Sequence, residues 1–404
     1  MTLLLIGYND GVLTALDGIW PRSSVVVLEE RDLWEGKQLA GKAARHPSLA
    51  EVRFGRYQQD EQYLDVVAGI PPVTAVAPGL EYAVEAAATA AEVLDLPGAG
   101  SKAASVLRDK LRLREAAAAA GMPGPAFQEV NSADDIARFA AGRPCVVKPA
   151  SRQASLGVVL LDAEDDPVPA WRECSQADEV NQLAERPLRW RYLVEERLYG
   201  PEYSTECLVE NGELRFLNVT AKRTVSGRYP VEIGHLVPGD AGDLTPWRRA
   251  VGHLVRAVGF GTGILHAEWV HTGAGPVLIE CAGRPPGDMI MDLIDLAYRT
   301  NLTDLWLRLL AGRSVSPPTT AVAGSAIRFL TCGTGVIDRI DGVDQARRMP
   351  GVRLIRLVRG PGDRLAGLRS SWDRVGSVIA VAESAQQAAE YAGAAVAQIS
   401  VRLS

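Results

Sequence analysis

The chain has 404 residues, of which 47% are hydrophobic and 23% charged, and its formal net charge is −6. This length exceeds one ordinary hydrophobic core, so we expect two to four domains. Charges of both signs are interspersed, and no long basic run or membrane-length apolar stretch occurs, so neither nucleic acid nor a membrane is expected as the main partner.

The start of the chain and its cysteines indicate a cytoplasmic protein. Residues 1–7 form a short apolar run without the basic segment and cleavage site of a signal peptide, so a strand is predicted there. The cysteines are scattered, without a close pair or metal-type spacing: they are Cys145, Cys174, Cys207, Cys281 and Cys332. We therefore expect reduced thiols, a cytoplasmic location and no zinc site.

Residues 2–6 and 24–28 are short apolar runs, and residues 11–20 between them have room for one helix. This strand–helix–strand pattern predicts a parallel sheet. The loop GYNDG at 7–11 carries only half of a dinucleotide fingerprint, so it supports a dehydrogenase poorly. An alanine-rich helix is predicted at 81–94, and Pro97-Gly98 ends it. We place the end of a first domain near residue 98.

The rest of the chain alternates predicted helices with paired strands. Ser101 is typical of an N-cap, for a helix reaching about residue 120. Further helices are predicted at 245–259 and 288–311. Predicted strands lie at 144–148, 158–161, 192–196, 203–209, 214–220, 264–270 and 276–280. The turns ENGE and HTGAG make hairpins of two strand pairs, and residues 313–320 read as a linker to a smaller α+β piece.

The segment 264–291 carries the clearest chemical pattern. Glu268 lies in an otherwise apolar strand, Glu280 ends the next one, and Arg284 follows four residues later. A hairpin places such carboxylates side by side, where they share a proton, pair with a cation or hold a hard metal such as magnesium. A structural Glu–Arg ion pair explains this spacing equally well.

Three other segments suggest phosphate or nucleotide binding. Lys148 ends an apolar strand before a Ser- and Gly-containing loop, a setting that suits phosphate. Three carboxylates cluster between strands in the run LVEERLYGPE: Glu195, Glu196 and Glu202. A third segment contains Lys222, Glu232 and His235. Taken singly, each of these is better explained as a surface lysine, a solvated acidic loop or a satisfied histidine.

Together and in this order, these segments resemble the ATP-grasp superfamily, with the specific motifs between residues 101 and 292. Within it the chain resembles the carboxylate–amine ligases that make dipeptides, the L-amino acid ligases of the bacilysin-forming type, through VEIGH at 231–235. The resemblance implies an α/β and α+β ATP-grasp fold. Its parts are an N-terminal Rossmann-like domain (1–98), a lid lobe (101–191), a catalytic lobe (192–312) and a C-terminal α+β domain (313–404).

The resemblance also implies site residues. Those for ATP are Lys110, Lys148, Ser155, Gly157, Glu195, Glu196, Leu198, Glu202 and Lys222. Among these, Glu195 is expected to take the adenine amino group, the backbone of Glu196 and Leu198 the ring edge, and Glu202 the ribose. Loop 149–157 is expected to act as a lid. Two magnesium ions, which manganese can replace, are expected at Glu232, Glu268 and Glu280. Catalytic roles are expected for Lys222, His235 and Arg284.

Two departures from the family pattern affect these expectations. The usual Glu-x-Asn after the second acid is Glu280-Cys281-Ala282 here, and Ala282 cannot bind metal. The phosphate loop carries Arg152, Gln153 and Ala154 where small residues are common.

The expected reaction turns a carboxylate into an acyl phosphate and couples it to an amine. The substrates are then small acids and amines, and a homodimer is expected. The alternatives are a carboxylase that activates bicarbonate and a nucleotide-binding regulator without turnover.

Overall fold

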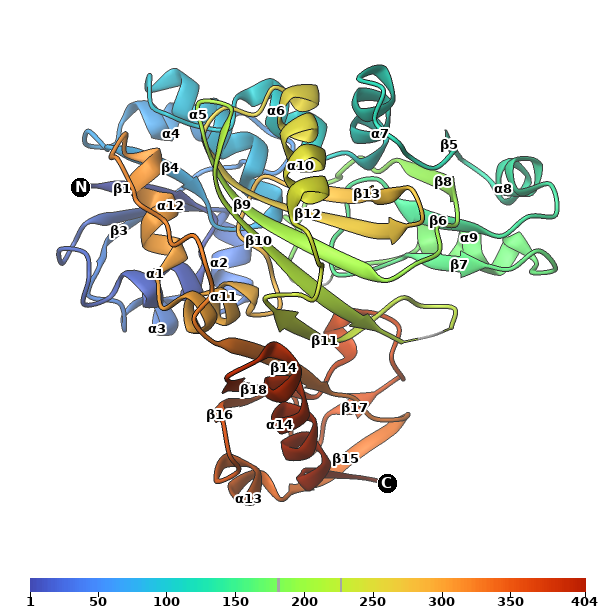
Figure 1. Cartoon of the computed structure of the whole chain (residues 1–404). Helices are drawn as coiled ribbons and strands as arrows, with labels where there is room; N and C mark the ends of the chain where they lie inside the picture. Colours follow the sequence, from blue (N-terminus) through green and yellow to red (C-terminus); the bar gives the residue numbers. More distant parts are fainter. Residues whose placement is uncertain (180–181, 226) are drawn as a thin grey trace.

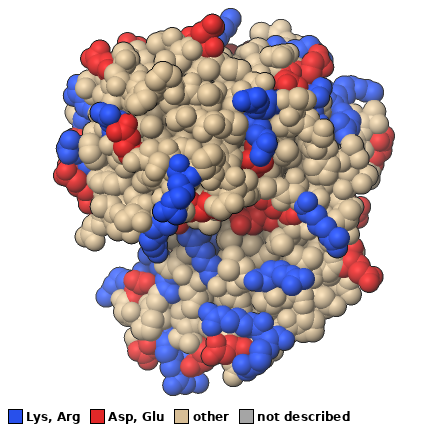
Figure 2. Space-filling model, turned by 90° about the vertical axis from the view of Figure 1, so that its left-hand side faces the viewer, with Lys and Arg blue, Asp and Glu red and all other residues tan. Residues whose placement is uncertain are grey.

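The structure, a computed structural model, describes residues 1–179, 182–225 and 227–404. Across these residues the strands form four sheets, and the largest runs through the middle of the molecule (Figure 1). Every helix in the described chain is too short or too polar to cross a lipid bilayer. On the face drawn in Figure 2, basic and acidic side chains are interspersed, and both kinds reach the furrow between a larger and a smaller body.

The N-terminal part is a parallel sheet of order β3-β2-β1-β4, as the sequence predicts. Its elements are β1 (Leu3–Ile6), α1 (Asp10–Leu16), β2 (Val25–Glu29), α2 (Arg31–Gly36), α3 (Ala40–Ala43), β3 (Leu49–Phe54), α4 (Tyr63–Ala68), β4 (Ala75–Pro78), η1 (Glu81–Ala83) and α5 (Val84–Val93). Strands β1 and β2 are buried along their whole length because helices cover both faces of the sheet.

Residues 101–120 form two helices, α6 (Ser101–Leu107) and α7 (Lys110–Ala119), so the prediction of one helix is wrong. The break lies at Asp109, whose extended backbone and side chain cap α7 by accepting from the N–H groups of Leu111 and Arg112. The prediction that Ser101 is the N-cap is also wrong: Gly100 is the N-cap of α6, and it makes no side-chain hydrogen bond. The break turns Lys110 toward the centre of the molecule.

The expected lid lobe is built on an antiparallel sheet of order β5-β8-β6-β7, and this sheet includes β8, which lies beyond the expected boundary at residue 191. Its elements are β5 (Phe127–Glu129), α8 (Ala133–Ala140), β6 (Cys145–Pro149), β7 (Val159–Leu161), α9 (Pro167–Ser175) and β8 (Tyr192–Glu196). The predicted hairpin of β6 and β7 is confirmed. Helix α9 was not predicted, because its acidic and proline-containing sequence is typical of a loop.

The central sheet has the order β13-β12-β9-β10-β11-β14-β18-β16 and continues from the catalytic lobe into the C-terminal part. The elements of the expected catalytic lobe are the strands β9 (Glu202–Glu210), β10 (Glu213–Thr224), β11 (Glu232–Val237), β12 (Gly263–Thr272) and β13 (Gly275–Ala282) and the helices α10 (Thr245–Val258), α11 (Ile290–Tyr298) and α12 (Leu302–Leu310). The predicted helix at 288–311 is in fact two helices, because Arg299 is left-handed and Asn301 caps α12.

The C-terminal part extends the same sheet by three strands and also forms a small three-stranded sheet of its own. Its elements are β14 (Gly324–Leu330), β15 (Gly335–Asp341), α13 (Val343–Arg347), β16 (Val352–Leu357), β17 (Arg364–Leu365), η2 (Ser371–Asp373), β18 (Gly376–Ala382), α14 (Ala385–Gln398) and β19 (Ser400–Leu403). Strand β14 pairs with β11, so His235 lies opposite Ile327. The domain boundary expected near residue 312 therefore divides one continuous sheet.

Candidate active site

Two adjoining cavities of about 320 and 310 Å³ lie against the central sheet, a size typical of small-molecule sites. The inter-sheet cavity lies between the lid sheet and the central sheet and is lined by Lys148, Glu195 and Glu202, among others. The inner cavity is lined by Glu81, His235, Arg284 and Asp288, among others. The two cavities share Lys110, Arg152, Gln153, Ser155, Glu232, Glu268 and Glu280.

Glu268 and Glu280 are direct cross-strand partners in the hairpin of β12 and β13, as the sequence predicts. Each carboxylate meets a lysine from another element. Lys110, at the start of α7, lies 3.0 Å from Glu280, and Lys222 of β10 forms an ion pair with Glu268. Two carboxylates held side by side in this way require such cations, because their mutual repulsion is strong at a partly buried site.

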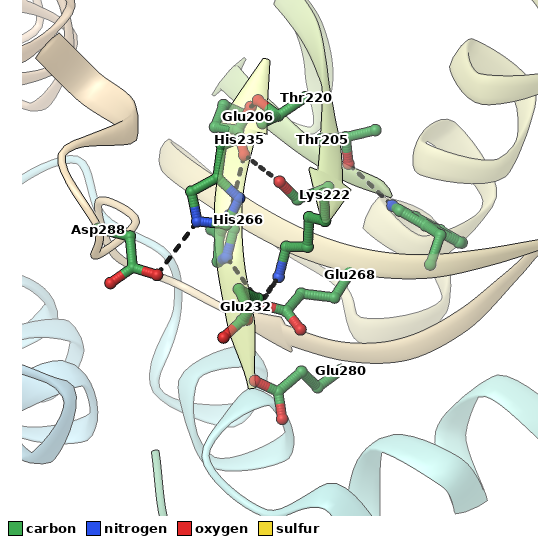
Figure 3. A network of polar contacts seen from close by, with 12 residues as sticks. Thr205, Glu206, Thr220, Lys222, Glu232, His235, His266, Glu268, Glu280 and Asp288 are labelled. Carbon is green, nitrogen blue, oxygen red and sulfur yellow. Dashed lines mark hydrogen bonds and ion pairs between the residues drawn. The ribbon is translucent and has the colours of Figure 1, made fainter. Parts of the chain in front are cut away.

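Behind Glu268 lies a buried charge pair that the sequence analysis missed (Figure 3). Nδ1 of His266 is 3.0 Å from the carboxylate of Glu206, and Nε2 is 3.2 Å from that of Glu268. Glu206 also accepts hydrogen bonds from Ser204, Asn218 and Thr220, and it is completely buried. Burial opposes protonation of His266, but the two carboxylates outweigh it and raise its pKa to about 9.

This pKa shift predicts that the protein loses stability between about pH 6.5 and pH 9. The folded state binds the His266 proton more tightly than the unfolded state, so the contribution is complete below pH 6.5 and disappears as the pH rises through about 9. A shift of this size corresponds to at most about 3 kcal/mol. The denaturant concentration at the unfolding midpoint is expected to fall in the wild type as the pH is raised across this range. It is expected to fall less in His266→Gln, and equal slopes in the two proteins would contradict the prediction.

Glu232 of β11 is the next acid in the network and contacts three groups. Lys222 Nζ lies 3.3 Å away, Arg374 Nη2 donates over 3.0 Å, and Ser371 Oγ donates over 3.2 Å. The side chain of Lys222 is only 2% exposed. Burial opposes its charge, but Glu268 and Glu232 raise the pKa of Lys222. Lys222, predicted to meet phosphate, is therefore first a counter-ion to the acids, and it lines the inner cavity.

His235 and Asp288 complete the network at the far wall of the inner cavity. His235 Nε2 lies 3.1 Å from Asp288, whose other oxygen accepts from Arg374 over 2.6 Å. The whole His235 side chain is 1% exposed, whereas Asp288 is 27% exposed. Asp288 is thus the more exposed of the two groups at this wall of the cavity. Burial opposes ionisation of Asp288, but His235 and Arg374 lower its pKa.

Glu195 has a different setting from the expected contact with an adenine amino group. One carboxylate oxygen accepts from Arg114 Nε over 2.7 Å, and the other lies 2.7 Å from Lys148 Nζ. All three side chains are at most 5% exposed. Glu195 therefore ties α7 to β6 and fixes the ammonium group of Lys148 in the cavity wall.

Most of the residues predicted for ATP line the inter-sheet cavity. They are Lys110, Lys148, Ser155, Glu195, Glu196, Leu198 and Glu202. Burial raises the pKa of Glu202 to about 7; Lys222 opposes this, and Glu268 and Glu232 add to it. Gly157 lines neither cavity: its φ is +72°, and a Cβ there would lie 2.8 Å from Ala177 and 3.0 Å from Pro149. Glycine is needed at 157 for this close packing rather than for contact with the cavity.

Arg284 is bound to an acid that the sequence analysis did not single out. Buried Glu81 forms ion pairs with both Arg284 and Arg108. Burial favours the protonated acid, but Arg284 and Arg108 hold the pKa of Glu81 at about 2. Arg284 also donates to the carbonyl of Pro285 over 2.7 Å. This pairing fixes the guanidinium of Arg284 at the wall of the inner cavity.

The three predicted metal ligands fit magnesium in kind, since all offer carboxylate oxygens and all line both cavities. No three or more His, Cys, Asp or Glu side chains in the described part of the chain are arranged to hold a metal ion. The ammonium groups of Lys110 and Lys222 lie against Glu280, Glu268 and Glu232 instead. The metal roles of these acids stay predictions.

The N-terminal sheet does not offer a dinucleotide site. Glu29 ends β2 and Glu30 follows it, at the point where such a site needs an acid for the ribose. Glu29 accepts from the N–H of Tyr8 over 2.7 Å. Glu30 holds both terminal nitrogens of Arg186 at 2.8 and 2.7 Å. Arg186 belongs to a strap, residues 182–189, that lies over this edge of the sheet, so both acids are committed to internal contacts.

Two segments of the chain match known protein families. Residues 141–292 match the ATP-grasp domain family, and residues 328–404 match a family described as L-amino acid ligase C-terminal domain 2. The chain contains an ATP-grasp domain. The expected ATP-grasp fold is therefore confirmed.

Two proteins related in sequence and one solved structure illustrate what this ATP-grasp chain is similar to. The uncharacterized protein y4rH of Sinorhizobium fredii is 31% identical over 310 residues, 73% of this chain, and the chain spans 61% of its length. A formate-dependent phosphoribosylglycinamide formyltransferase of Burkholderia mallei is 28% identical over 82% of this chain and 80% of its own length. The structure of L-amino acid ligase from Bacillus licheniformis has a TM-score of 0.83 at 20% identity, covering 100% of this chain and 98% of that one.

Proposed function

We propose that this ATP-grasp protein is an ADP-forming ligase. It phosphorylates the carboxylate of a small acid, with an amino acid as the best candidate, and couples the acyl phosphate to an amine to give an amide or dipeptide. The match of residues 328–404 to an L-amino acid ligase domain supports this class of ligase. We also propose that the protein is a homodimer. A cytoplasmic location is proposed as well, and the five free thiols support it.

One observation carries the proposal: two cavities of similar size meet at the Glu268–Glu280 pair. A ligase of this kind needs one space for the nucleotide and another for the acid and amine, and the phosphoryl group must pass between them. The shared wall, formed by Lys110 and the two acids, lies where that transfer would occur. An isolated structural ion pair would not require the second cavity.

The residues of the inter-sheet cavity would bind and orient ATP. The backbone of Glu196 and Leu198 would hold the adenine edge and Glu202 the ribose, while Lys110 and Lys148 would neutralise phosphate oxygens. Magnesium ions held by Glu232, Glu268 and Glu280 would supply further positive charge to the phosphates. Loop 149–157, which carries Ser155 and borders both cavities, would keep water from the acyl phosphate.

The residues of the inner cavity would orient the acid and the amine. Arg284, fixed by Glu81, would hold a carboxylate near the transferring phosphoryl group. The carboxylate oxygen attacks the terminal phosphorus and ADP leaves; an uncharged amine then attacks the carbonyl carbon and phosphate leaves. Lys222 and Arg284 would stabilise the negative charge that develops on the oxygens during both steps.

A second candidate activates a one-carbon acid. The formyltransferase relative is named for its use of formate, and bicarbonate activation was already an alternative from the sequence. The acids and cations of the shared wall are suited to phosphorylating any small carboxylate. The inner cavity, at about 310 Å³, is larger than formate or bicarbonate alone requires.

The deciding experiment is phosphate release from ATP and magnesium in a screen over pairs of amino acids, followed by mass spectrometry. We expect release that requires both an acid and an amine, with a product equal to their sum minus one water. Release that needs formate or bicarbonate instead would favour the second candidate. Binding of ADP without turnover under any of these conditions would favour a regulator and overturn the proposal.

A further inference from the structure

Arg374, from the C-terminal part of the chain, lies behind two acids that line the inner cavity, Glu232 and Asp288. It follows the turn η2, is 4% exposed, and lies with its guanidinium carbon 3.8 Å from the ring centre of Phe329. The same ring contacts His235 edge-on, with the ring centres 5.6 Å apart. Stacking on Phe329 of β14 therefore fixes the plane of the Arg374 guanidinium without any ligand.

The two ends of this guanidinium contact acids from two different segments. Nη2 donates to Glu232 of β11 over 3.0 Å, and Nη1 donates to Asp288, in the segment before α11, over 2.6 Å. Both acids line the inner cavity. A planar fork with fixed donors can set the separation of two carboxylates, which a single ammonium group cannot do.

The turn before Arg374 also reaches the lid loop. Ser371 donates its backbone N–H to the carbonyl of Ala154 over 3.2 Å and its hydroxyl to Glu232 over 3.2 Å. Ala154 and Ser155 both have a φ of 57°, a left-handed conformation that side chains other than glycine adopt only when their surroundings hold them there. Residues 370–374 thus contact the lid loop, the expected metal ligand Glu232 and Asp288, which lines the inner cavity.

We propose that Arg374 is a positioning residue of the ligase reaction, which places Glu232 and Asp288 at the spacing that the coupling step requires. This inference rests on the proposed function and makes the C-terminal part a component of the catalytic machinery. It predicts that Arg374 acts on kcat and on divalent-metal affinity. The KM for ATP changes less, because the nucleotide cavity is lined chiefly by other elements.

The test compares Arg374→Ala, Arg374→Lys and the control Arg369→Ala. Arg369 is exposed on the same segment, and its guanidinium makes no ion pair in the described residues, so Arg369→Ala is expected to match the wild type. Loss of a residue that orients metal ligands typically costs about 10–100-fold. We expect that loss in the kcat of Arg374→Ala, a smaller one in Arg374→Lys, and recovery of Arg374→Ala with added guanidinium ion.

A second readout does not depend on turnover. Manganese affinity, measured by water proton relaxation in the presence of ADP, is expected to fall about 10–100-fold in Arg374→Ala and to stay unchanged in Arg369→Ala. If the wild type makes no product from any substrate pair, the proposed function fails, and this measurement still tests the role of Arg374. Wild-type kcat and manganese affinity in Arg374→Lys would overturn the inference, and that variant decides the matter if Arg374→Ala does not fold.

Discussion

Glu280→Gln is expected to lower the rate of phosphate release by at least about 100-fold while the protein stays folded. Glutamine keeps the shape of the side chain but removes the charge that faces Lys110 and lines both cavities. A carboxylate oxygen suited to magnesium is lost at the point where the phosphoryl group would pass. The Glu280 side chain is 35% exposed, so the loss of its ion pair should cost at most about 1 kcal/mol of stability.

The measurement is steady-state phosphate release at saturating ATP, together with the thermal unfolding midpoint. Glu213→Gln is the matched control, since Glu213 is exposed at the start of β10 and lines neither cavity. That variant should keep wild-type turnover. Near-normal phosphate release in folded Glu280→Gln would remove Glu280 from the set of expected metal ligands.

Glu195→Gln is expected to destabilise the lid lobe by about 3–5 kcal/mol, because Arg114 and Lys148 would lose their shared counter-charge at a buried site. Chemical denaturation will give the overall loss. Hydrogen exchange should show it concentrated in β6 and β8, which Glu195 and Lys148 join side by side.

The neighbouring residue provides the control for this variant. Glu196 is exposed, and its side chain contacts only the backbone N–H of Ala126 over a long 3.4 Å, among the described residues. Glu196→Gln should therefore change stability by less than about 0.5 kcal/mol. If both variants unfold at the same denaturant concentration as the wild type, Glu195 does not hold this corner of the cavity as the contacts indicate.

Patterns local in the sequence predicted much of this arrangement. Alternation and turn residues indicated the hairpin that pairs Glu268 with Glu280, and its register is as expected. The parallel N-terminal sheet and the strand that ends at Lys148 and Pro149 followed from short apolar runs. These features follow from short runs of neighbouring residues and the turns between them, so local spacing carries the information.

The partners of the site residues could not be predicted, because they come from distant segments. Glu81 meets Arg284 across 203 positions, and Arg374 meets Glu232 across 142. Nothing in the local sequence of Glu81, within an alanine-rich helical run, distinguishes it from a surface acid. His266 is the exception: a histidine two residues before a strand acid in a buried strand signals that an ion pair is possible, and we did not use that signal.

The two helix breaks were missed for a related reason. Helical periodicity persists through residues 101–120 and 288–311, and the capping residues Asp109 and Asn301 lie inside these two runs. Either residue is also acceptable on the polar face of a continuous helix, so the sequence leaves two solutions. Packing of the shorter helices against the central sheet selects the broken ones.

The strap at residues 182–189 limits how the molecule can open. It leads directly into β8, and its Arg186 grips Glu30 while the N–H of Ala184 donates to Gln58 over 3.0 Å. A rigid-body rotation of the lid lobe away from the N-terminal sheet would break these contacts. The loop between β6 and β7 takes no part in these contacts, so we expect this loop, rather than the whole lobe, to admit a nucleotide. A truncated chain without its first 98 residues would lose Glu30 and Gln58, the partners of these contacts.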